Sequence, residues 1–145
     1  MLVLCLVAAC LPGSVSSVTT AAGESVTLEI RQAGTQATPS TTLKWELVFP
    51  TQSMALEGDK PEAGSAATAS GKELQCNLTK PYIYACILFG GVKPLSNGPL
   101  AIFRFKIAAA AAPAKTSFRL QRSEAAGADS KFIVLNDAEA TVTIH

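Results

Sequence analysis

The feature that most constrains this sequence is a series of short segments in which apolar and polar residues alternate. The segments Val26–Ile30, Leu43–Phe49 and Phe103–Ile107 follow this pattern, and Phe118–Gln121 and Ala140–Ile144 repeat it. A period of two is typical of a β-strand with one buried face. Turn-forming Gly, Asn, Asp and Pro residues separate the segments, and short strands at this spacing predict an all-β sandwich.

Weaker strands are expected between these segments. The run Ala108–Ala112 favours helix by composition, but five residues before Pro113 cannot form a stable helix alone, so we expect a strand end and a loop. Residues 57–71 and 121–131 are more polar and are interpreted as softer stretches. The weaker strand candidates are Val15–Thr19, Ser53–Leu56, Lys72–Cys76 and Tyr84–Phe89.

Length and charge restrict the class of protein. A chain of 145 residues fits one domain, and a hydrophobic content of 48% with a net charge of +1 favours a packed core over disorder. No basic run interleaves with aromatic residues. The composition therefore argues against nucleic acid or an anionic membrane surface as a partner.

The N-terminus is interpreted as an export segment. Residues 2–9 are uninterrupted apolar residues, and Leu11–Ser14 breaks the run. This pattern is typical of the end of a signal peptide. Because no basic residues precede the run, we expect the export signal to be truncated. The run is too short to span a bilayer. Val7–Cys10 also resembles a lipobox, in which Cys10 would carry a lipid anchor; alternatively, Cys10 is an ordinary residue. We expect residues 1–13 to be the signal or lipoprotein segment and residues 14–145 the domain.

Two cysteines lie in the predicted domain. Cys76 and Cys86 flank a short segment, and two adjacent antiparallel strands could bring them within disulfide distance. Export to an oxidising compartment favours the disulfide over two buried free thiols. Zinc needs about four ligands, and only His145 could join the two thiols, so no metal site is expected.

The order of these landmarks resembles the cohesin-like domain of bacterial surface and extracellular proteins, in an Ala-rich form. The resemblance covers residues 14–145 and implies a nine-stranded jelly-roll, Ig-like β-sandwich. It also implies a bacterial protein that is secreted or on the cell surface. The landmarks are Ala22–Leu28, Leu43–Leu47, Ala67–Cys76, Cys86–Gly90, Leu95–Phe105, Ala125–Ala128 and Ala140–Ile144.

The resemblance also implies a function, because cohesin modules bind dockerin modules through one flat sheet face. That face uses strands three, five, six and eight of the family's fold. Tyr and Arg are enriched among binding hot spots. The alternative for each residue is an ordinary solvated position. The candidate binding residues are Lys44, Glu46, Tyr82, Tyr84, Ser117, Arg119 and Gln121.

A catalytic role is not expected. The single histidine, His145, is the last residue, so a triad has no base. A glycosidase needs two carboxylates that face each other, and no sequence feature marks any two of those available as such a pair. No phosphate-binding loop or cofactor motif is present. The carboxylates considered are Glu57, Asp59, Glu62, Asp129 and Asp137.

Three functions remain open at this point. The first is a non-catalytic protein-binding module with a dockerin-like partner. The second is a carbohydrate-binding or adhesive module for polysaccharide, which needs exposed aromatic rings. Trp45 is in phase with Leu43 and Leu47 and is expected in the core, so this function ranks lower. The third is a structural spacer with no specific ligand.

Overall fold

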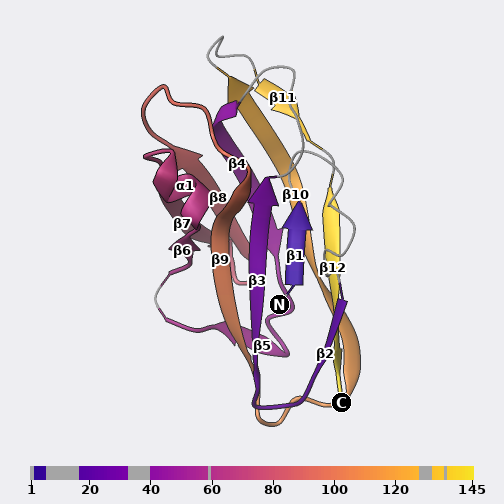
Figure 1. Ribbon diagram of the computed structural model, residues 1–145. Helices are drawn as coiled ribbons and strands as arrows, with labels where there is room; N and C mark the ends of the chain where they lie inside the picture. Colours follow the sequence, from indigo (N-terminus) through magenta and orange to yellow (C-terminus); the bar gives the residue numbers. More distant parts are fainter. Residues whose placement is uncertain (1, 6–16, 33–39, 59, 128–131, 136) are drawn as a thin grey trace.

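Two β-sheets lie face to face and enclose one core between them (Figure 1). The computed structural model describes residues 2–5, 17–32, 40–58, 60–127, 132–135 and 137–145. Within these residues the chain is almost entirely β-strand, as the alternating pattern predicts. The fold class is an all-β sandwich, which confirms the prediction.

The smaller sheet has five strands in the order β1-β3-β9-β5, and β6 also pairs with β9. β1 runs parallel to β3, and the other pairs are antiparallel. Its strands are β1 (Leu2–Cys5), β3 (Ser25–Gln32), β9 (Gly98–Ile107), β5 (Met54–Leu56) and β6 (Glu62–Ala63).

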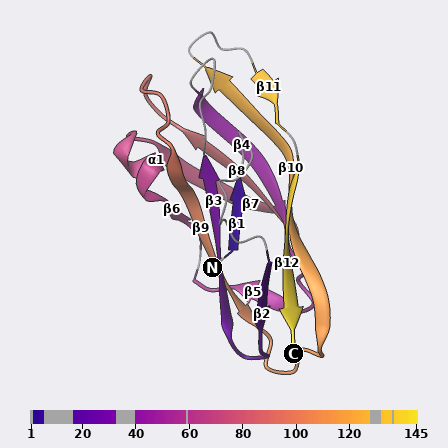
Figure 2. The same ribbon diagram turned by 45° about the vertical axis from the view of Figure 1, so that its right-hand side comes forward.

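The larger sheet has seven strands in the order β2-β12-β10-β4-β8-β7, and β11 pairs with β10. β10 is the longest strand: its first half pairs with β12 and its second half with β11 (Figure 2). β2 runs parallel to β12. The strands are β2 (Ser17–Thr20), β12 (Ala138–Ile144), β10 (Ala114–Gly127), β4 (Ser40–Val48), β8 (Ile83–Phe89), β7 (Glu73–Lys80) and β11 (Phe132–Val134).

The core consists of the inward side chains of both sheets. Trp45 on β4 is 2% exposed, and Phe103 and Phe105 on β9 and Phe118 on β10 are fully buried. The ring centroids of Phe105 and Phe118 lie 4.9 Å apart, so aromatic contacts join the two sheets. The inward facing expected for Trp45 is therefore confirmed.

The described residues form more elements than expected. Three short strands, β1, β6 and β11, add to the nine-strand plan, and a helix, α1 (Ser65–Ala69), lies in the stretch interpreted as soft and polar. A five-residue helix has too few internal hydrogen bonds to be stable alone, so its residues do not predict it from sequence. It is held by packing: Ala66 and Ala67 are buried, and a Cβ at Gly64 would lie 2.4 Å from the Pro99 backbone.

The N-terminal segment is described in part. Leu2–Cys5 forms β1 along the edge of β3, whereas Cys10 and the expected boundary at residue 13 lie outside the described residues. The signal or lipoprotein interpretation of residues 1–13 stays a prediction. The described part of the chain contains no helix with the length and apolar character that a membrane crossing requires.

A disulfide joins Cys76 on β7 to Cys86 on β8, as the sequence predicts. The two cysteines are direct cross-strand partners in the β7–β8 ladder. Cys86 is buried against the core. The bond therefore fastens β7, an edge strand of the seven-stranded sheet, to β8.

Candidate functional site

The outer face of the seven-stranded sheet carries an unusual apolar strip. The outward residues of β8 lie opposite Val48, Glu46 and Lys44 of β4 and Glu73 of β7. An antiparallel strand with one solvated face normally alternates apolar and polar residues, yet β8 is apolar on this face as well as on the inner one. We call this set the apolar strip; it consists of Val48, Ile83, Ala85, Ile87 and Phe89.

Polar and charged side chains border the apolar strip on both sides. Gln75 and Asn77 lie opposite Ile87 and Ala85 on β7. On the other side, the Lys44 ammonium forms an ion pair with Glu124 at 2.9 Å and lies 4.9 Å from the ring centroid of Phe132. An apolar centre with a polar border is the usual anatomy of a protein interface.

A β-bulge interrupts β10 in the middle of this face. The register with β4 shifts between Gln121 and Glu124, and Arg122 adopts a φ of 49°. The extra residue turns Ser123 inward, where it is buried, and Arg122 outward. The Arg122 side chain is 79% exposed, and its Nε lies 3.9 Å from Glu46 Oε1. Bulges often redirect a side chain at a functional site.

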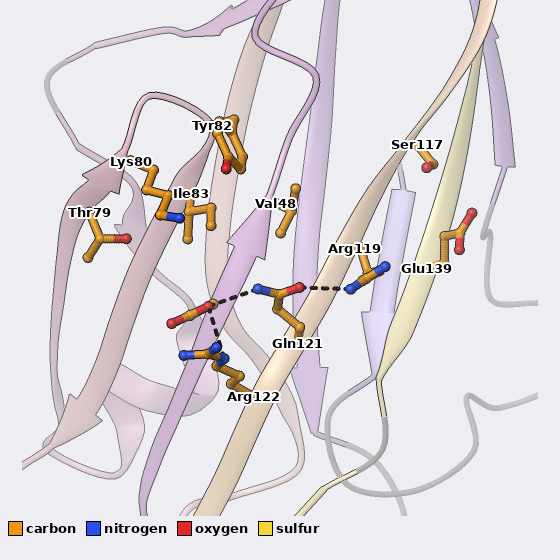
Figure 3. Close-up of a pocket in the computed structure, with 11 residues that line it drawn as sticks. Val48, Thr79, Lys80, Tyr82, Ile83, Ser117, Arg119, Gln121, Arg122 and Glu139 are labelled. Atoms are coloured by element: carbon orange, nitrogen blue, oxygen red, sulfur yellow. Dashed lines mark hydrogen bonds and ion pairs between the residues drawn. The ribbon is translucent and has the colours of Figure 1, made fainter.

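A chain of polar contacts crosses the face from β10 to β4 (Figure 3). Arg119 donates a hydrogen bond of 2.9 Å from its guanidinium to Gln121 Oε1. Gln121 in turn donates from Nε2 to Glu46 Oε1, also at 2.9 Å. Glu46 thus accepts from Gln121 and faces Arg122, whereas Arg119 is held by a neutral amide.

Two hollows lie on this face, and the Glu46–Arg122 pair lines both. The first, of about 690 Å³, extends across the strands from Thr79 and Lys80 to Glu139 (Figure 3). The second, of about 450 Å³, lies over β4, β8 and β7 and includes Lys44, Glu124, Gln75 and Asn77. The hollows are open troughs in a sheet face, a shape that suits a protein segment.

Most of the residues predicted for binding lie together on this face. Tyr82 is in the turn before β8, is 43% exposed and borders the first hollow. Within the same face, β4 contributes two of the predicted residues and β10 three: Lys44, Glu46, Ser117, Arg119 and Gln121.

The placement of Tyr84 corrects its prediction. Its cross-strand partner is Leu47, an inward residue, and its ring centroid lies 5.3 Å from that of Phe49 in the core. Burial raises the pKa of the Tyr84 phenol. Tyr84 and Tyr82 do not share a face because Tyr82 belongs to the turn, where the period of two does not apply.

Sequence reasoning missed the apolar strip and Arg122. A sequence signal existed for the apolar strip. Residues 83–89 are apolar or aromatic at every position, which departs from the alternation of the neighbouring strands. The inserted residue in β10 becomes visible only in the structure, where the buried positions change from even numbers at Phe118 and Leu120 to odd ones at Ser123 and Ala125.

Two of the acidic residues considered for catalysis are engaged by other side chains in the described part of the chain. Glu62 pairs with Arg104 at 3.0 Å, and Glu57 accepts a hydrogen bond from Ser25. Asp59 and Asp129 lie outside the described residues. Within those residues, no group of three or more His, Cys, Asp or Glu side chains is placed to hold a metal ion.

Comparison with known proteins identifies the fold. No family model matches the sequence, and no curated protein matches it. Among solved structures, the sixth cohesin of scaffoldin B from Acetivibrio cellulolyticus, in complex with a mutant Cel5 dockerin, is similar with a TM-score of 0.75 and 15% identity. The match covers 90% of this chain and 95% of that one.

Two further structures support the same conclusion. The cohesin of the Coh-OlpA–Doc918 complex from Clostridium thermocellum has a TM-score of 0.76 and 11% identity, with 97% of each chain covered. A non-cellulosomal cohesin from the archaeon Archaeoglobus fulgidus has a TM-score of 0.69 and 13% identity, over 90% of this chain and 87% of that one. The chain therefore has the fold of a cohesin module.

Proposed function

We propose that this cohesin-like domain is a non-catalytic protein-binding module that uses the outer face of the seven-stranded sheet. Its partner is a dockerin-like module. Cohesins of the same fold form complexes with dockerins, including the Cel5 dockerin and Doc918. The partner is proposed from that likeness, and the location of the binding face from the residues of this chain.

The observation that carries the proposal is the apolar strip on β8. Ala85, Ile87 and Phe89 remain partly exposed although they are apolar. Exposed apolar residues that are contiguous and bordered by polar ones mark sites of protein contact. A partner that covers the strip would remove this surface from water, which stabilises the complex by about 25 cal/mol for each Å² buried.

The proposed location is secreted or on the cell surface. The Cys76–Cys86 disulfide supports it, because disulfides persist in oxidising compartments outside the cytosol. The lipid anchor on Cys10 remains part of the proposal as an alternative to free secretion. A polysaccharide partner has less support, because Trp45 is buried and the partly buried Tyr84 packs against the core, so neither can join an exposed aromatic platform.

The test places one bulky charge on each outer face in turn. Ile87→Arg puts a cation in the middle of the apolar strip, and Thr27→Arg puts the same residue on an outward position of β3 in the five-stranded sheet. Both are tested against a panel of purified dockerin modules by isothermal titration calorimetry. We expect binding by the parent, a loss of at least about 30-fold for Ile87→Arg, and no change for Thr27→Arg.

Circular dichroism and thermal unfolding show whether each variant keeps the fold. Binding that survives Ile87→Arg, or that is lost in Thr27→Arg, would contradict the proposed face. No binding to any dockerin in the panel would contradict the dockerin-like partner.

A further inference from the structure

We infer that the first hollow binds an acidic amphipathic helix of the partner, whose carboxylates contact Arg119 and Lys80. This inference rests on the proposed function and specifies the partner's chemistry. It follows from three features of the hollow: which charges are already paired, how far apart the free ones are, and what lies between them.

The charges of the hollow are not balanced within the fold. Three basic side chains line it, against two acidic ones, Glu46 and Glu139. Glu46 is engaged by Gln121 and by Arg122. Among the described residues, no carboxylate forms an ion pair with Arg119 or Lys80, although Glu139 is the cross-strand partner of Arg119.

Gln121 keeps the charge of Arg119 available. Its amide oxygen accepts from the guanidinium and its amide nitrogen donates to Glu46. The amide thus orients Arg119 without neutralising it and separates it from the Glu46 carboxylate. Arg119 is exposed and retains further N–H donors for a second acceptor. A carboxylate is the acceptor that a guanidinium binds in a bidentate geometry.

The spacing of the two cations suits a helix. Lys80 is on β7 and Arg119 is on β10, with β8 and β4 between them. Three strand spacings of about 4.8 Å separate the two backbones by about 14 Å. Figure 3 shows the Lys80 side chain extending towards Ile83. Two glutamates seven positions apart on a helix are about 10.5 Å apart along its axis. Their side chains can span the remaining distance to both cations.

The floor between the two cations is apolar. Val48 and Ile83, both members of the apolar strip, line the hollow between its two ends. The hollow runs across the strands, so a helix lying in it would place its apolar side on this floor and its two carboxylates at the ends. Tyr82, 43% exposed, adds an aromatic ring at the Lys80 end.

The probe is a synthetic Ala-rich helical peptide with two leucines on one side and glutamates at positions i and i+7. Binding is followed by chemical-shift changes in the isotope-labelled full chain, at low and at high salt. We expect shifts around Lys80, Ile83 and Arg119, about three- to tenfold weaker binding when both glutamates are replaced by Gln, and a similar weakening at high salt.

Variants of the protein assign the effect to the two cations. The pair Lys80→Gln with Arg119→Gln should weaken the glutamate peptide about three- to tenfold and leave the Gln peptide unchanged. Gln121→Glu should weaken the glutamate peptide by a smaller factor, because the new carboxylate neutralises Arg119 within the fold but leaves Lys80. Lys106→Gln is the matched control, since Lys106 is an exposed cation of the five-stranded sheet with Ser25 and Ala55 as cross-strand neighbours.

Equal binding of the glutamate and Gln peptides, or no shifts around the hollow at low salt, would overturn the inference. The same holds if a peptide with glutamates at i and i+4 binds as well as the i and i+7 peptide. The two proposals fail separately. If the affinity of a dockerin falls with Ile87→Arg but not with Lys80→Gln and Arg119→Gln, the proposed binding face stands and the acidic helix is contradicted.

Discussion

The outer faces of the two sheets differ in how many of their charged side chains are paired and in how many apolar side chains they expose. On the five-stranded sheet, Glu29 pairs with Arg31 at 2.6 Å, and Glu62 pairs with Arg104 at 3.0 Å. The outward positions of β3 are polar: Ser25, Thr27 and Arg31 are at least partly exposed, and Glu29 is buried but paired. On the seven-stranded sheet, the outward positions of β8 are apolar, and Arg119 rests against a neutral amide.

The difference separates two roles within one sandwich. Charges that are paired in the fold leave little for another protein to gain, since a partner would have to break the existing pairs. Apolar residues that remain exposed, together with cations that lack a carboxylate, gain from a partner that supplies what is missing. Under the proposed function, the five-stranded sheet closes the core, and the seven-stranded sheet closes the core and also presents the binding face.

Both faces depend on the same core, and its loss should remove the difference between them. Trp45→Ala truncates the largest buried side chain under the seven-stranded sheet. We expect the free energy of unfolding to fall by about 3–5 kcal/mol, because a cavity is left and apolar contacts are lost. Denaturant unfolding measures this.

Lys44→Ala, the outward neighbour of Trp45 on β4, is the control. It should cost about 1 kcal/mol or less, because its ion pair with Glu124 is near the surface. Similar losses for the two variants would mean that β4 does not have an inner and an outer side.

The alternation that separates these two sides was readable from sequence because it is local. In the segment Leu43–Phe49, Leu43, Trp45, Leu47 and Phe49 are each two positions apart, and all four are buried. The same rule placed Lys44, Glu46, Arg119 and Gln121 outward. These residues needed no knowledge of the rest of the chain.

The features that sequence reasoning missed depend on contacts between distant segments. Tyr84 follows a turn, so its facing is set by the register with Leu47 rather than by Tyr82. The bulge at Arg122 arises where β10 changes its neighbour from β12 to β11. α1 exists because Gly64 packs directly on Pro99. None of these contacts leaves a periodic pattern in the residues that make it.

The disulfide joins two strands of the seven-stranded sheet, so its loss should destabilise that sheet more than the five-stranded one. Replacing Cys76 and Cys86 with Ala together should lower the free energy of unfolding by about 2–3 kcal/mol, the loop-closure value for this short separation. Hydrogen exchange should show protection lost first in β7, which is an edge strand, with β9 unchanged. Equal loss of protection in β7 and β9 would mean that the bond supports the whole sandwich.

The smallest effect concerns the bulge. Arg122 is the one non-glycine residue with a positive φ in the described part of the chain. A left-handed conformation is unfavourable for a residue with a Cβ, and functional sites often retain such strain. Arg122→Gly relieves it but adds backbone entropy to the unfolded chain, so we expect a net gain of about 0.5 kcal/mol in the free energy of unfolding.

Arg122→Ala is the matched control for this gain. It removes the same side chain and its long, exposed contact with Glu46, but it keeps the Cβ and therefore the strain. The stability difference between the Gly and Ala variants isolates the backbone, and thermal unfolding measures it. A Gly variant more stable than the Ala variant would mean that the binding face is maintained at some cost to the fold. A Gly variant less stable than the Ala variant would mean that the bulge carries no strain, and that Arg122 is an ordinary member of a solvated face like that of the five-stranded sheet.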